Sequence, residues 1–586
     1  MTTEVISLAI EPGIQRDGTL FDSPRYVDGQ WCRFQRGRPR KIGGYRAIFL
    51  NATGISRGMA QNSANSLNYM YSGFSSGIEA WQIDNDDGTG SGPTEITLSG
   101  FTTNANNLWQ FDFVYDAYGT GQLTILAHPG QNLSDIDSTT NTPVLFGLFP
   151  YGNMSQVGVF TATGTISSTT FTITGVNALI AAGQLVTGTG VAANTKVTAA
   201  VIAGGNTTVT LSIAATSSGS QTFTFNNQIS VSGGVVCLYP YTFVYGNNGL
   251  IQNNSANNLQ DWVAADSNAN NVCATKVVKG LPVRGGSASP AGLFWSLDSV
   301  IRVTYNPTTV GTSTIYWSYD TISSQSSILS SSCVIEYDGI FYWIGVDRFL
   351  MYNGVVQELP NVINFNYFFN NLNYTQRQKV WASKVPRWGE IWWFFPSGNS
   401  TECNDAIIYN VREKTWYDAG QALGARRSAG TYSEVYHYPI WAGWETNAIA
   451  GISLWQHETG TNQISLSNVD AVLSYFETNS LGWVSGGPGS KAIQGTNRWI
   501  RIERVEPDFV QLEQMSVTVT GKGYADDVDV TSDPYYFDPT TLKVDMREQR
   551  REMRLRFTSN IVNGAYEMGN VLLSADFGDE RSTGNP

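Results

Sequence analysis

The sequence predicts an all-β protein: a β-propeller with a small β-sandwich-like insertion and a C-terminal β region. Three observations predict this class. Charged residues make up only 14% of the 586 residues, so the charged faces that long amphipathic helices need are scarce. Aromatic residues make up 12%, and together with 59 glycines they indicate many short strands separated by turns. Units of several aromatic-rich strands recur along the chain, as the blades of a propeller do.

The clearest unit covers residues 333–360. Asp338-Gly339 and Asn353-Gly354 are tight-hairpin signals, and each is flanked by apolar strands. Similar units recur at 67–83, 108–127, 293–319, 380–417 and 431–456. An array of β-sandwiches is the competing interpretation. The propeller is favoured because the aromatic strands recur without the long crossovers of Greek keys.

Residues 1–156 are expected to form an N-terminal arm and the first propeller blades, and residues 157–226 an inserted domain. Between Asp137 and Asp261 the only charged side chain is Lys196, and the segment 157–226 contains no Trp or Tyr. Thr and Val alternate within it, which is the period of a half-buried strand. A flexible linker is the alternative, but linkers lack regular β-branched alternation.

The remaining blades are expected in 227–497, with one short helix. Within 360–379, Ile363 and Tyr367 are four positions apart after Pro360, which favours one to three helical turns. Residues 498–586 are expected to form the C-terminal β region. There Arg554 and Arg556 alternate with apolar residues, a pattern typical of a strand with one solvent-facing side.

The charge distribution limits the classes of function. The formal net charge of −13 argues against a general nucleic-acid binder, although DNA could still pass through such a protein without sticking. No apolar run reaches the length needed to cross a bilayer. The first residues lack the basic and apolar regions of a signal peptide, so we expect synthesis in a cytoplasm. The five cysteines are at least 36 residues apart and are interpreted as structural thiols.

No catalytic signature stands out, so we expect that the chain is not an enzyme and needs no cofactor or metal. His128, His437 and His457 each stand alone in sequence. The acidic run at residues 84–87, with Glu95, resembles a calcium loop, but Thr89 stands where that loop needs glycine. The glycine–lysine segments 489–491 and 521–523 lack the spacing of a phosphate loop and are interpreted as turns.

Two charged segments are candidate sites. The first is a basic cluster that holds six of the 35 basic residues in 14 positions: Arg33, Arg36, Arg38, Arg40, Lys41 and Arg46. It could contact phosphate, form a salt-bridged interface with a partner, or be a solvated arm. The second is an acidic loop, interpreted as a channel or surface loop: Asp526, Asp527, Asp529, Asp533 and Asp538.

Three segments of the N-terminal region resemble the opening of tail proteins from short-tailed bacteriophages. They are EPGIQRDGT (11–19), FDSPRYVDGQW (21–31) and GRPRKIGGY (37–45). Residues 333–420 are similar in their order of features: a strand pair, a short helix, a strand containing Trp392-Trp393-Phe394-Phe395, and a closing Trp416-Tyr417. The resemblance covers about half of the chain and skips 157–226. The family comprises tail nozzle or hub proteins, also called packaged-DNA stabilisation proteins.

The resemblance implies a propeller-based protomer and a homohexameric ring below the portal and adaptor proteins. It also implies a position near tail fibres or a tail needle, a channel for double-stranded DNA, and assembly into a virion in the host cytoplasm. It carries over no catalytic residue. A glycan-binding surface propeller is the alternative function, because exposed Trp and Tyr stack on sugars, and a polysaccharide-degrading enzyme is the third.

Overall fold

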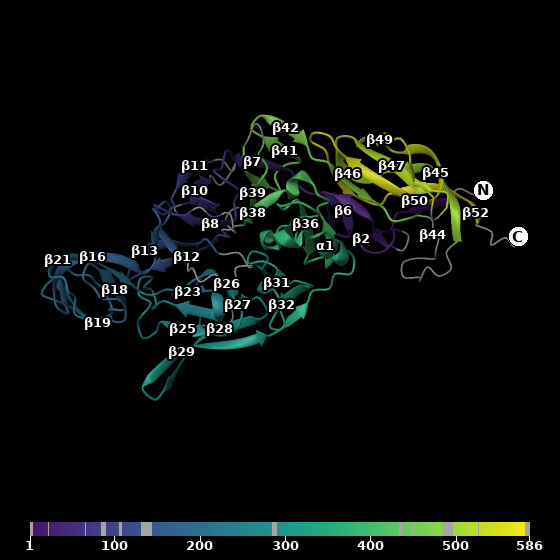
Figure 1. The fold of residues 1–586 in the computed structure, drawn as a ribbon. Helices are drawn as coiled ribbons and strands as arrows, with labels where there is room; N and C mark the ends of the chain where they lie inside the picture. The colour runs from purple at the N-terminus through teal and green to yellow at the C-terminus, as the bar shows by residue number, and fades with distance from the viewer. Residues whose placement is uncertain are drawn as a thin grey trace. The chain divides into compact units, whose positions relative to one another are not determined.

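The computed structural model describes residues 4–20, 23–64, 66–83, 90–102, 104, 108–130, 143–283, 290–432, 438–446, 451–481, 483–484, 496–524 and 527–580. These residues form an all-β protein, as the composition predicts (Figure 1). The described helical segments are short: α1 (Phe365–Asn371) and the 3-10 turns η1 (Asn247–Gly249), η2 (Tyr374–Lys379) and η3 (Leu423–Ala425). None of the described helices is long and apolar enough to cross a membrane.

Two compact units divide the chain. The propeller unit comprises Ser56–Asn85 and Gly90–Glu358. The terminal unit contains both ends of the chain and comprises Met1–Ile55, Asp86–Thr89 and Leu359–Pro586.

The propeller unit contains five antiparallel four-stranded sheets, each a meander of consecutive strands. The first two sheets are β8 (Gly58–Ala64), β9 (Leu67–Gly73), β10 (Ile78–Ile83) and β11 (Gly90–Glu95), then β12 (Gln110–Asp116), β13 (Gln122–His128), β14 (Leu145–Leu148) and β15 (Ser155–Gln156). The next two are β22 (Gly234–Leu238), β23 (Tyr241–Tyr245), β24 (Leu250–Asn253) and β25 (Asn268–Asn271), then β26 (Val277–Pro282), β27 (Ala291–Ser296), β28 (Val300–Val310) and β29 (Ser313–Ser323). The fifth is β30 (Ile335–Tyr337), β31 (Ile340–Ile344), β32 (Phe349–Tyr352) and β33 (Val356–Glu358).

Turn chemistry and aromatic packing explain these blades. Asp338 and Gly339 both have positive φ, 50° and 79°, as the tight turn between β30 and β31 requires. The first strands β8, β12, β22 and β26 neighbour one another in order, so successive sheets pack face to face. The buried Trp295 ring joins the fourth and fifth sheets, because it lies 5.7 Å from Phe341 and 5.8 Å from Trp343. The predicted β-propeller architecture is therefore observed.

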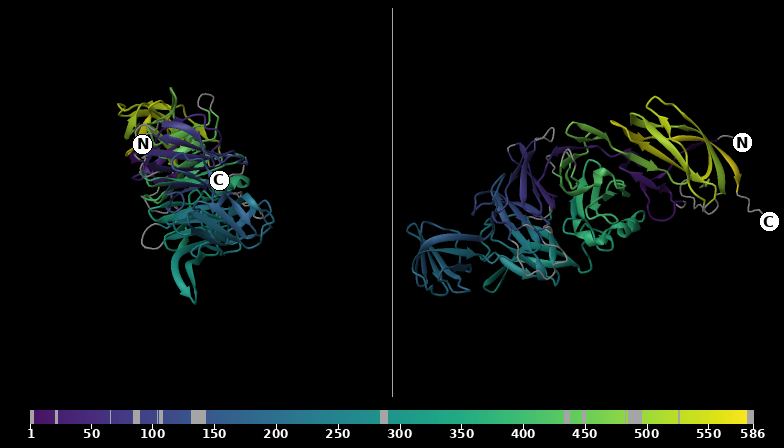
Figure 2. Two further views of the ribbon diagram at one scale, coloured as in Figure 1. Left: turned by 90° about the vertical axis from the view of Figure 1, so that its left-hand side faces the viewer. Right: turned by 45° about the horizontal axis from the view of Figure 1, so that its top comes forward.

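The insertion forms a sheet of its own (Figure 2). The sheet has six strands and its own core of buried aliphatic and Phe side chains. Its strands are β16 (Val159–Ser167), β17 (Thr170–Thr174), β18 (Leu185–Gly188), β19 (Val197–Ala203), β20 (Asn206–Leu211) and β21 (Gly219–Asn226). Backbone hydrogen bonds connect its edges: Val186 N donates to Thr195 O, and Val197 N donates to Gln184 O. The sheet therefore curls on itself. Val159 pairs with Asn226, so the insertion leaves and re-enters the propeller unit at adjacent points.

The terminal unit contains a further meander and a mixed sheet. The meander is β34 (Trp381–Val385), β35 (Glu390–Phe395), β36 (Asp405–Asn410) and β37 (Thr415–Asp418). The mixed sheet, in spatial order, is β38 (Arg427–Thr431), β39 (Ile440–Gly443), β40 (Leu454–His457), β7 (Tyr45–Phe49), β41 (Asn462–Ser465) and β42 (Asn468–Ala471). An N-terminal strand, β7, is thus built into a sheet made by residues 427–471.

The C-terminal strands also pair with the N-terminal segment. The long strand β50 (Val544–Ser559) organises a ten-stranded sheet with β1 (Glu4–Ser7), β4 (Asp28–Gln30), β43 (Ser474–Glu477), β44 (Trp483–Val484), β45 (Thr496–Glu506), β47 (Met515–Lys522), β48 (Val530–Thr531), β49 (Tyr535–Phe537) and β52 (Leu572–Glu580). A four-stranded sheet contains β46 (Phe509–Leu512), β51 (Ala565–Met568), β6 (Arg38–Lys41) and β5 (Cys32–Gln35). The parallel pair β2 (Glu11–Ile14) and β3 (Arg25–Tyr26) completes the unit. We expected an N-terminal arm and the first propeller blades in residues 1–156; strands β1, β4, β6 and β7 of this arm pair with strands from the second half of the chain.

Candidate functional site

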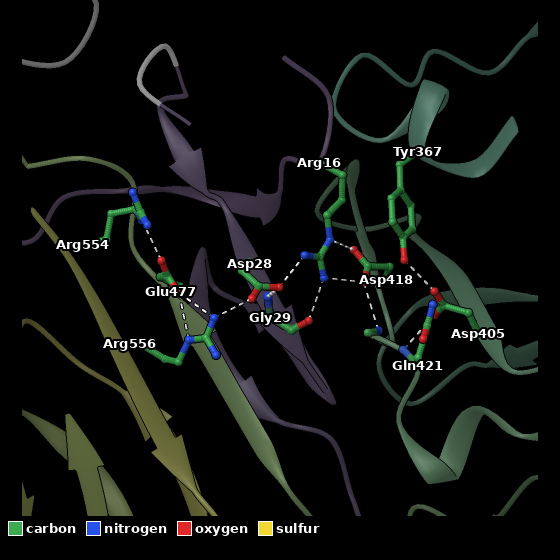
Figure 3. Close-up of polar contacts among 11 residues, drawn as sticks. Arg16, Asp28, Gly29, Tyr367, Asp405, Asp418, Gln421, Glu477, Arg554 and Arg556 are labelled. Carbon is green, nitrogen blue, oxygen red and sulfur yellow. Dashed lines mark hydrogen bonds and ion pairs between the residues drawn. The ribbon is translucent and has the colours of Figure 1, made fainter. Parts of the chain in front are cut away.

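Arg16 of the N-terminal motif lies between two carboxylates of the terminal unit (Figure 3). Its Nε donates to Asp418 Oδ2 and its Nη2 donates to Asp418 Oδ1, both over 2.9 Å. Nη1 pairs with Asp28, and Nη2 also donates to Gly29 O over 2.9 Å. Burial alone would lower the pKa of Arg16, but Asp418 and Asp28 raise it well above its ordinary value. Arg16 is therefore a permanent cation that ties the motif to the end of β37.

The next motif residue, Asp17, caps the short helix α1. Its carboxylate oxygens accept hydrogen bonds from Asn366 N over 2.7 Å and from Tyr367 N over 2.8 Å. These amides belong to the first turn of α1, where no intrahelical partner exists. Asn364, directly before the helix, makes no side-chain capping bond. A residue about 350 positions away in sequence therefore supplies the cap, and the motif fixes both α1 and β37.

A buried carboxylate adjoins this arrangement (Figure 3). Asp405 accepts a hydrogen bond from Tyr367 Oη over 2.7 Å and another from Gln421 N over 3.3 Å. Burial, together with the nearby charge of Asp418, raises the pKa of Asp405 to about 7. Gly420 N donates to Asp418 Oδ1 over 3.0 Å. Both carboxylates are fully buried and bonded to protein groups, so neither is open to a substrate.

The network extends from Asp28 into the C-terminal sheet. Arg556 Nη2 lies 2.8 Å from Asp28 Oδ2 and 2.8 Å from Glu477 Oε2. Arg554 Nε lies 2.7 Å from Glu477 Oε1, and its Nη2 lies 2.7 Å from Asp529. Leu555, which alternates with these arginines, is buried as expected, but Arg554 is buried too. The expectation that this strand has a solvent-facing side is therefore wrong at Arg554, because Glu477 compensates its charge.

A second buried network surrounds Arg33, which is 1% exposed. Its guanidinium pairs with Glu390 at 2.8 Å and with Glu458 at 2.6 Å. Glu390 also accepts hydrogen bonds from Trp392 Nε1 over 2.8 Å and from Tyr417 Oη over 2.6 Å. Burial raises the pKa of Glu390, while Arg33 lowers it. Protein groups bind both carboxylates of this network, so its role is structural.

The predicted basic cluster divides into internal and surface members. Arg33 and Lys41 are buried, which corrects their assignment to a partner interface: Lys41 Nζ donates to Gly564 O over 2.7 Å, and burial lowers its pKa to about 8. Arg46 donates to Gln456 inside the mixed sheet. Arg40 is one-third exposed and pairs with Glu567 at 2.8 Å. Arg36 is exposed, and Arg38 is half-buried.

The predicted acidic loop is at the surface. Asp526 lies outside the described residues. Asp527, Asp529, Asp533 and Asp538 are all exposed, and Asp529 pairs with Arg554. Hydrogen bonds from Thr540 and Thr541 lower the pKa of Asp538. The assignment to a surface loop thus agrees with their exposure, whereas a position in a channel stays a prediction.

The other candidate residues add no site. His437 and the segments 84–87 and 489–491 lie outside the described residues. Buried His457 accepts from Arg427 Nε over 2.9 Å, and burial, followed by the Arg427 charge, lowers its pKa well below the ordinary value. His128 Nδ1 accepts from Gly130 N over 3.0 Å. Within the described ranges, no three His, Cys, Asp or Glu side chains form a metal-binding group.

Sequence reasoning missed most residues of these networks: Arg16, Asp17, Asp28, Glu390, Asp405, Asp418, Glu458 and Glu477. A usable signal was present. In a chain with 14% charged residues, an isolated charge beside an aromatic run, as in Glu390-Ile391-Trp392-Trp393, is a candidate for burial with a partner. Only the tertiary structure shows which residue that partner is.

Comparisons with known proteins give matches to solved structures alone, since no protein-family model and no curated protein matches the chain. An exo-β-1,3-galactanase from Phanerochaete chrysosporium, crystallised with β-1,3-galactotriose, is 11% identical, with a TM-score of 0.26, over 91% of this chain and 100% of its own. An exported protein from Bacteroides fragilis is 7% identical, with a TM-score of 0.25, over 77% of this chain and 99% of its own. A glycoside hydrolase is 10% identical, with a TM-score of 0.24, over 90% of this chain and 99% of its own.

These matches correct one expectation. We expected that the chain is not an enzyme, and the glycoside hydrolases among the solved structures that it matches contradict this expectation. With TM-scores of 0.24 to 0.26, the likeness assigns no activity and no residue role to this chain.

Proposed function

We propose that the chain is a structural tail protein of a short-tailed bacteriophage, a nozzle or hub whose copies form a ring around a channel for the genome. The position of the motif residues 11–45 carries this proposal. Arg16 and Asp17 fix β37 and α1, Trp31 and Arg33 are buried in the core, and Lys41 bonds to Gly564, directly before β51. These contacts constrain the sequence of the segment, whereas an unpacked arm would tolerate almost any sequence. They therefore support a relation to the tail proteins that the segment resembles.

The charge distribution supports the same function. Residues 1–60 carry nine basic and five acidic side chains, whereas residues 501–586 carry ten basic and sixteen acidic ones. A protomer with a basic N-terminal segment and an acidic C-terminal region suits stacking between two different neighbours. We propose that these neighbours are the portal or adaptor on one side and tail fibres or a tail needle on the other. The net charge of −13 suits a conduit that double-stranded DNA crosses without tight binding. We place the protein in the virion, in six copies.

Imaging of the purified full-length chain by negative-stain electron microscopy tests the proposal. We expect rings with a central opening wide enough for duplex DNA. Monomers that release galactose from β-1,3-galactotriose would contradict the proposal and favour the alternative of a polysaccharide-degrading enzyme. Monomers that bind a host polysaccharide without hydrolysing it would favour a glycan-binding surface module.

A further inference from the structure

A basic surface gathers around Trp388 in the terminal unit. Three guanidinium groups lie over its ring: Arg33 and Arg40 at 4.7 Å and Arg387 at 5.1 Å from the centroid. Of these three arginines, Arg33 is buried and Arg387 is exposed. Strand β6 and the turns between β5 and β6, β34 and β35, and β36 and β37 supply the surface members, which we name the arginine patch: Arg36, Arg38, Arg40, Arg387, Arg412 and Lys414.

Contacts between the three turns hold the patch together. Arg412 donates to Arg387 O over 2.9 Å and to Pro386 O over 2.7 Å, which joins the β36–β37 turn to the β34–β35 turn. Arg36 N donates to Glu413 Oε1 over 3.0 Å, which joins the β5–β6 turn to the β36–β37 turn. In the part of the chain that the structure describes, Arg387, Arg412 and Lys414 form no ion pair. These three side chains therefore present positive charge that no ion pair compensates, on backbone that the turn contacts hold in place.

A surface of opposite character lies elsewhere in the same unit. Strands β48 and β49 pair with β47 alone, so they form an edge of the ten-stranded sheet. Tyr524 and the described segment 527–538 around them expose apolar and aromatic side chains: Tyr524 at 68%, Val528 at 78%, Val530 at 55% and Tyr536 at 60%. Asp527 and Asp533 are exposed beside them. We name this segment the acidic edge. Exposed apolar side chains that gather on one surface can mark a contact with another polypeptide.

We propose that the arginine patch of one copy binds the acidic edge of the next copy in the ring. This inference rests on the proposed function. The charges are complementary, and the planar guanidinium fork binds a carboxylate through two parallel hydrogen bonds. Because the two surfaces differ, the contact is head-to-tail, and such contacts close into a ring when the rotation between copies allows it.

The composition of the patch favours a polypeptide over a nucleic acid. Glu413 and Glu567 lie among the basic side chains, and they oppose a polyphosphate backbone, which is charged at every nucleotide, more than an edge with separated carboxylates. Three guanidinium groups already lie over the ring of Trp388, and they would compete with a base for stacking on it. In contrast, the apolar side chains of the acidic edge can pack against the rim of the arginine patch.

Charge reversal on each surface, followed by mixing, tests the proposal in the full-length chain. One variant is Arg387→Glu with Lys414→Glu, and the other is Asp527→Lys with Asp533→Lys. Each alone places like charges across the contact, so we expect the dissociation constant for assembly, measured by mass photometry, to rise at least about 100-fold. Mixing the two variants restores opposite charges at every contact, so we expect rings to reappear. Lys196→Glu, an exposed charge reversal on the insertion, is the matched control and should assemble normally.

Each other outcome overturns the proposal in a distinguishable way. Rings from both double variants would exclude this contact while leaving the ring itself intact. Loss of assembly without rescue on mixing would show that the two surfaces do not meet. Intact rings of the Arg387→Glu and Lys414→Glu variant with weakened binding of a short DNA duplex would identify the patch as a polyanion site instead. A monomeric wild-type chain would reject both the proposed function and this contact. Circular dichroism of each variant establishes that it is folded.

Discussion

Arg16 Nε donates a hydrogen bond to Asp418 Oδ2 over 2.9 Å, across 402 positions of sequence. A second bond from Arg16 Nη2 to Asp418 Oδ1, also 2.9 Å, makes the pair bidentate. Asp418 has no exposed side-chain surface and Arg16 has 17%. This ion pair fixes the N-terminal motif to the last strand of a meander in the second half of the chain.

Replacing Arg16 with Met should destabilise the terminal unit strongly. The change leaves the Asp418 carboxylate buried without its cation, and breaking such a pair costs about 3–5 kcal/mol in the free energy of unfolding. Urea denaturation followed by Trp fluorescence measures it. Arg348→Met, which removes the exposed Arg348–Asp347 pair, is the control and should change little. Equal stabilities of the two variants would contradict a structural role for Arg16.

The raised pKa of Asp405 predicts a pH dependence. Its folded-state pKa of about 7 exceeds the value of about 3.9 for an unfolded chain, so the folded protein binds the proton more tightly between these values. The stability that protonated Asp405 contributes is therefore present below about pH 4 and is lost as the pH rises through about 7.

Asp405→Asn, which keeps a neutral side chain at every pH, tests this dependence. We expect the melting temperature of the variant, relative to wild type, to increase as the pH rises from about 4 to about 8. Differential scanning calorimetry at several pH values measures the difference. If the difference stays constant over this range, Asp405 does not titrate as described.

Gly44 should tolerate no side chain. A Cβ at this position would lie 2.3 Å from Asn462 O and 2.5 Å from Asn462 N, which are backbone atoms of the neighbouring strand β41. We expect Gly44→Ala to lower the free energy of unfolding by about 1–3 kcal/mol. Gly523→Ala is the control, because its Cβ would meet only the end of the Asp527 side chain, at 3.0 Å. Similar losses in both variants, measured by urea denaturation, would argue against this steric role.

The insertion should be removable. It has its own core, and its ends are adjacent because Val159 pairs with Asn226. We expect replacement of residues 159–226 by a short glycine linker to leave the melting temperature of the remaining chain and its assembly state unchanged. Scanning calorimetry and mass photometry report both. Aggregation of the shortened chain would show that the insertion supports the propeller unit.

Local signals in the sequence predict much of the fold. Asp338-Gly339 forms a hairpin turn because both residues adopt positive φ. The segment without Trp or Tyr, 157–226, nearly coincides with the sheet from Val159 to Asn226. Helical turns α1 and η2 fall within 360–379. Each feature depends on residues close in sequence, which composition and spacing can reveal.

The candidate site could not be predicted in the same way. The cluster around Arg33 is basic in sequence, yet Arg33 is buried because Glu390 and Glu458, more than 350 positions away, compensate its charge. The pairing of residues 1–55 with C-terminal strands has the same origin. Such contacts depend on which strands the tertiary fold brings together, and no local pattern encodes them.

Native mass spectrometry of the purified full-length chain tests the central claim most directly. The protomer mass is 64.1 kDa, so a homohexamer has a mass of about 385 kDa. The account predicts this species at micromolar concentration and physiological salt. A particle of 64.1 kDa alone under the same conditions would contradict it.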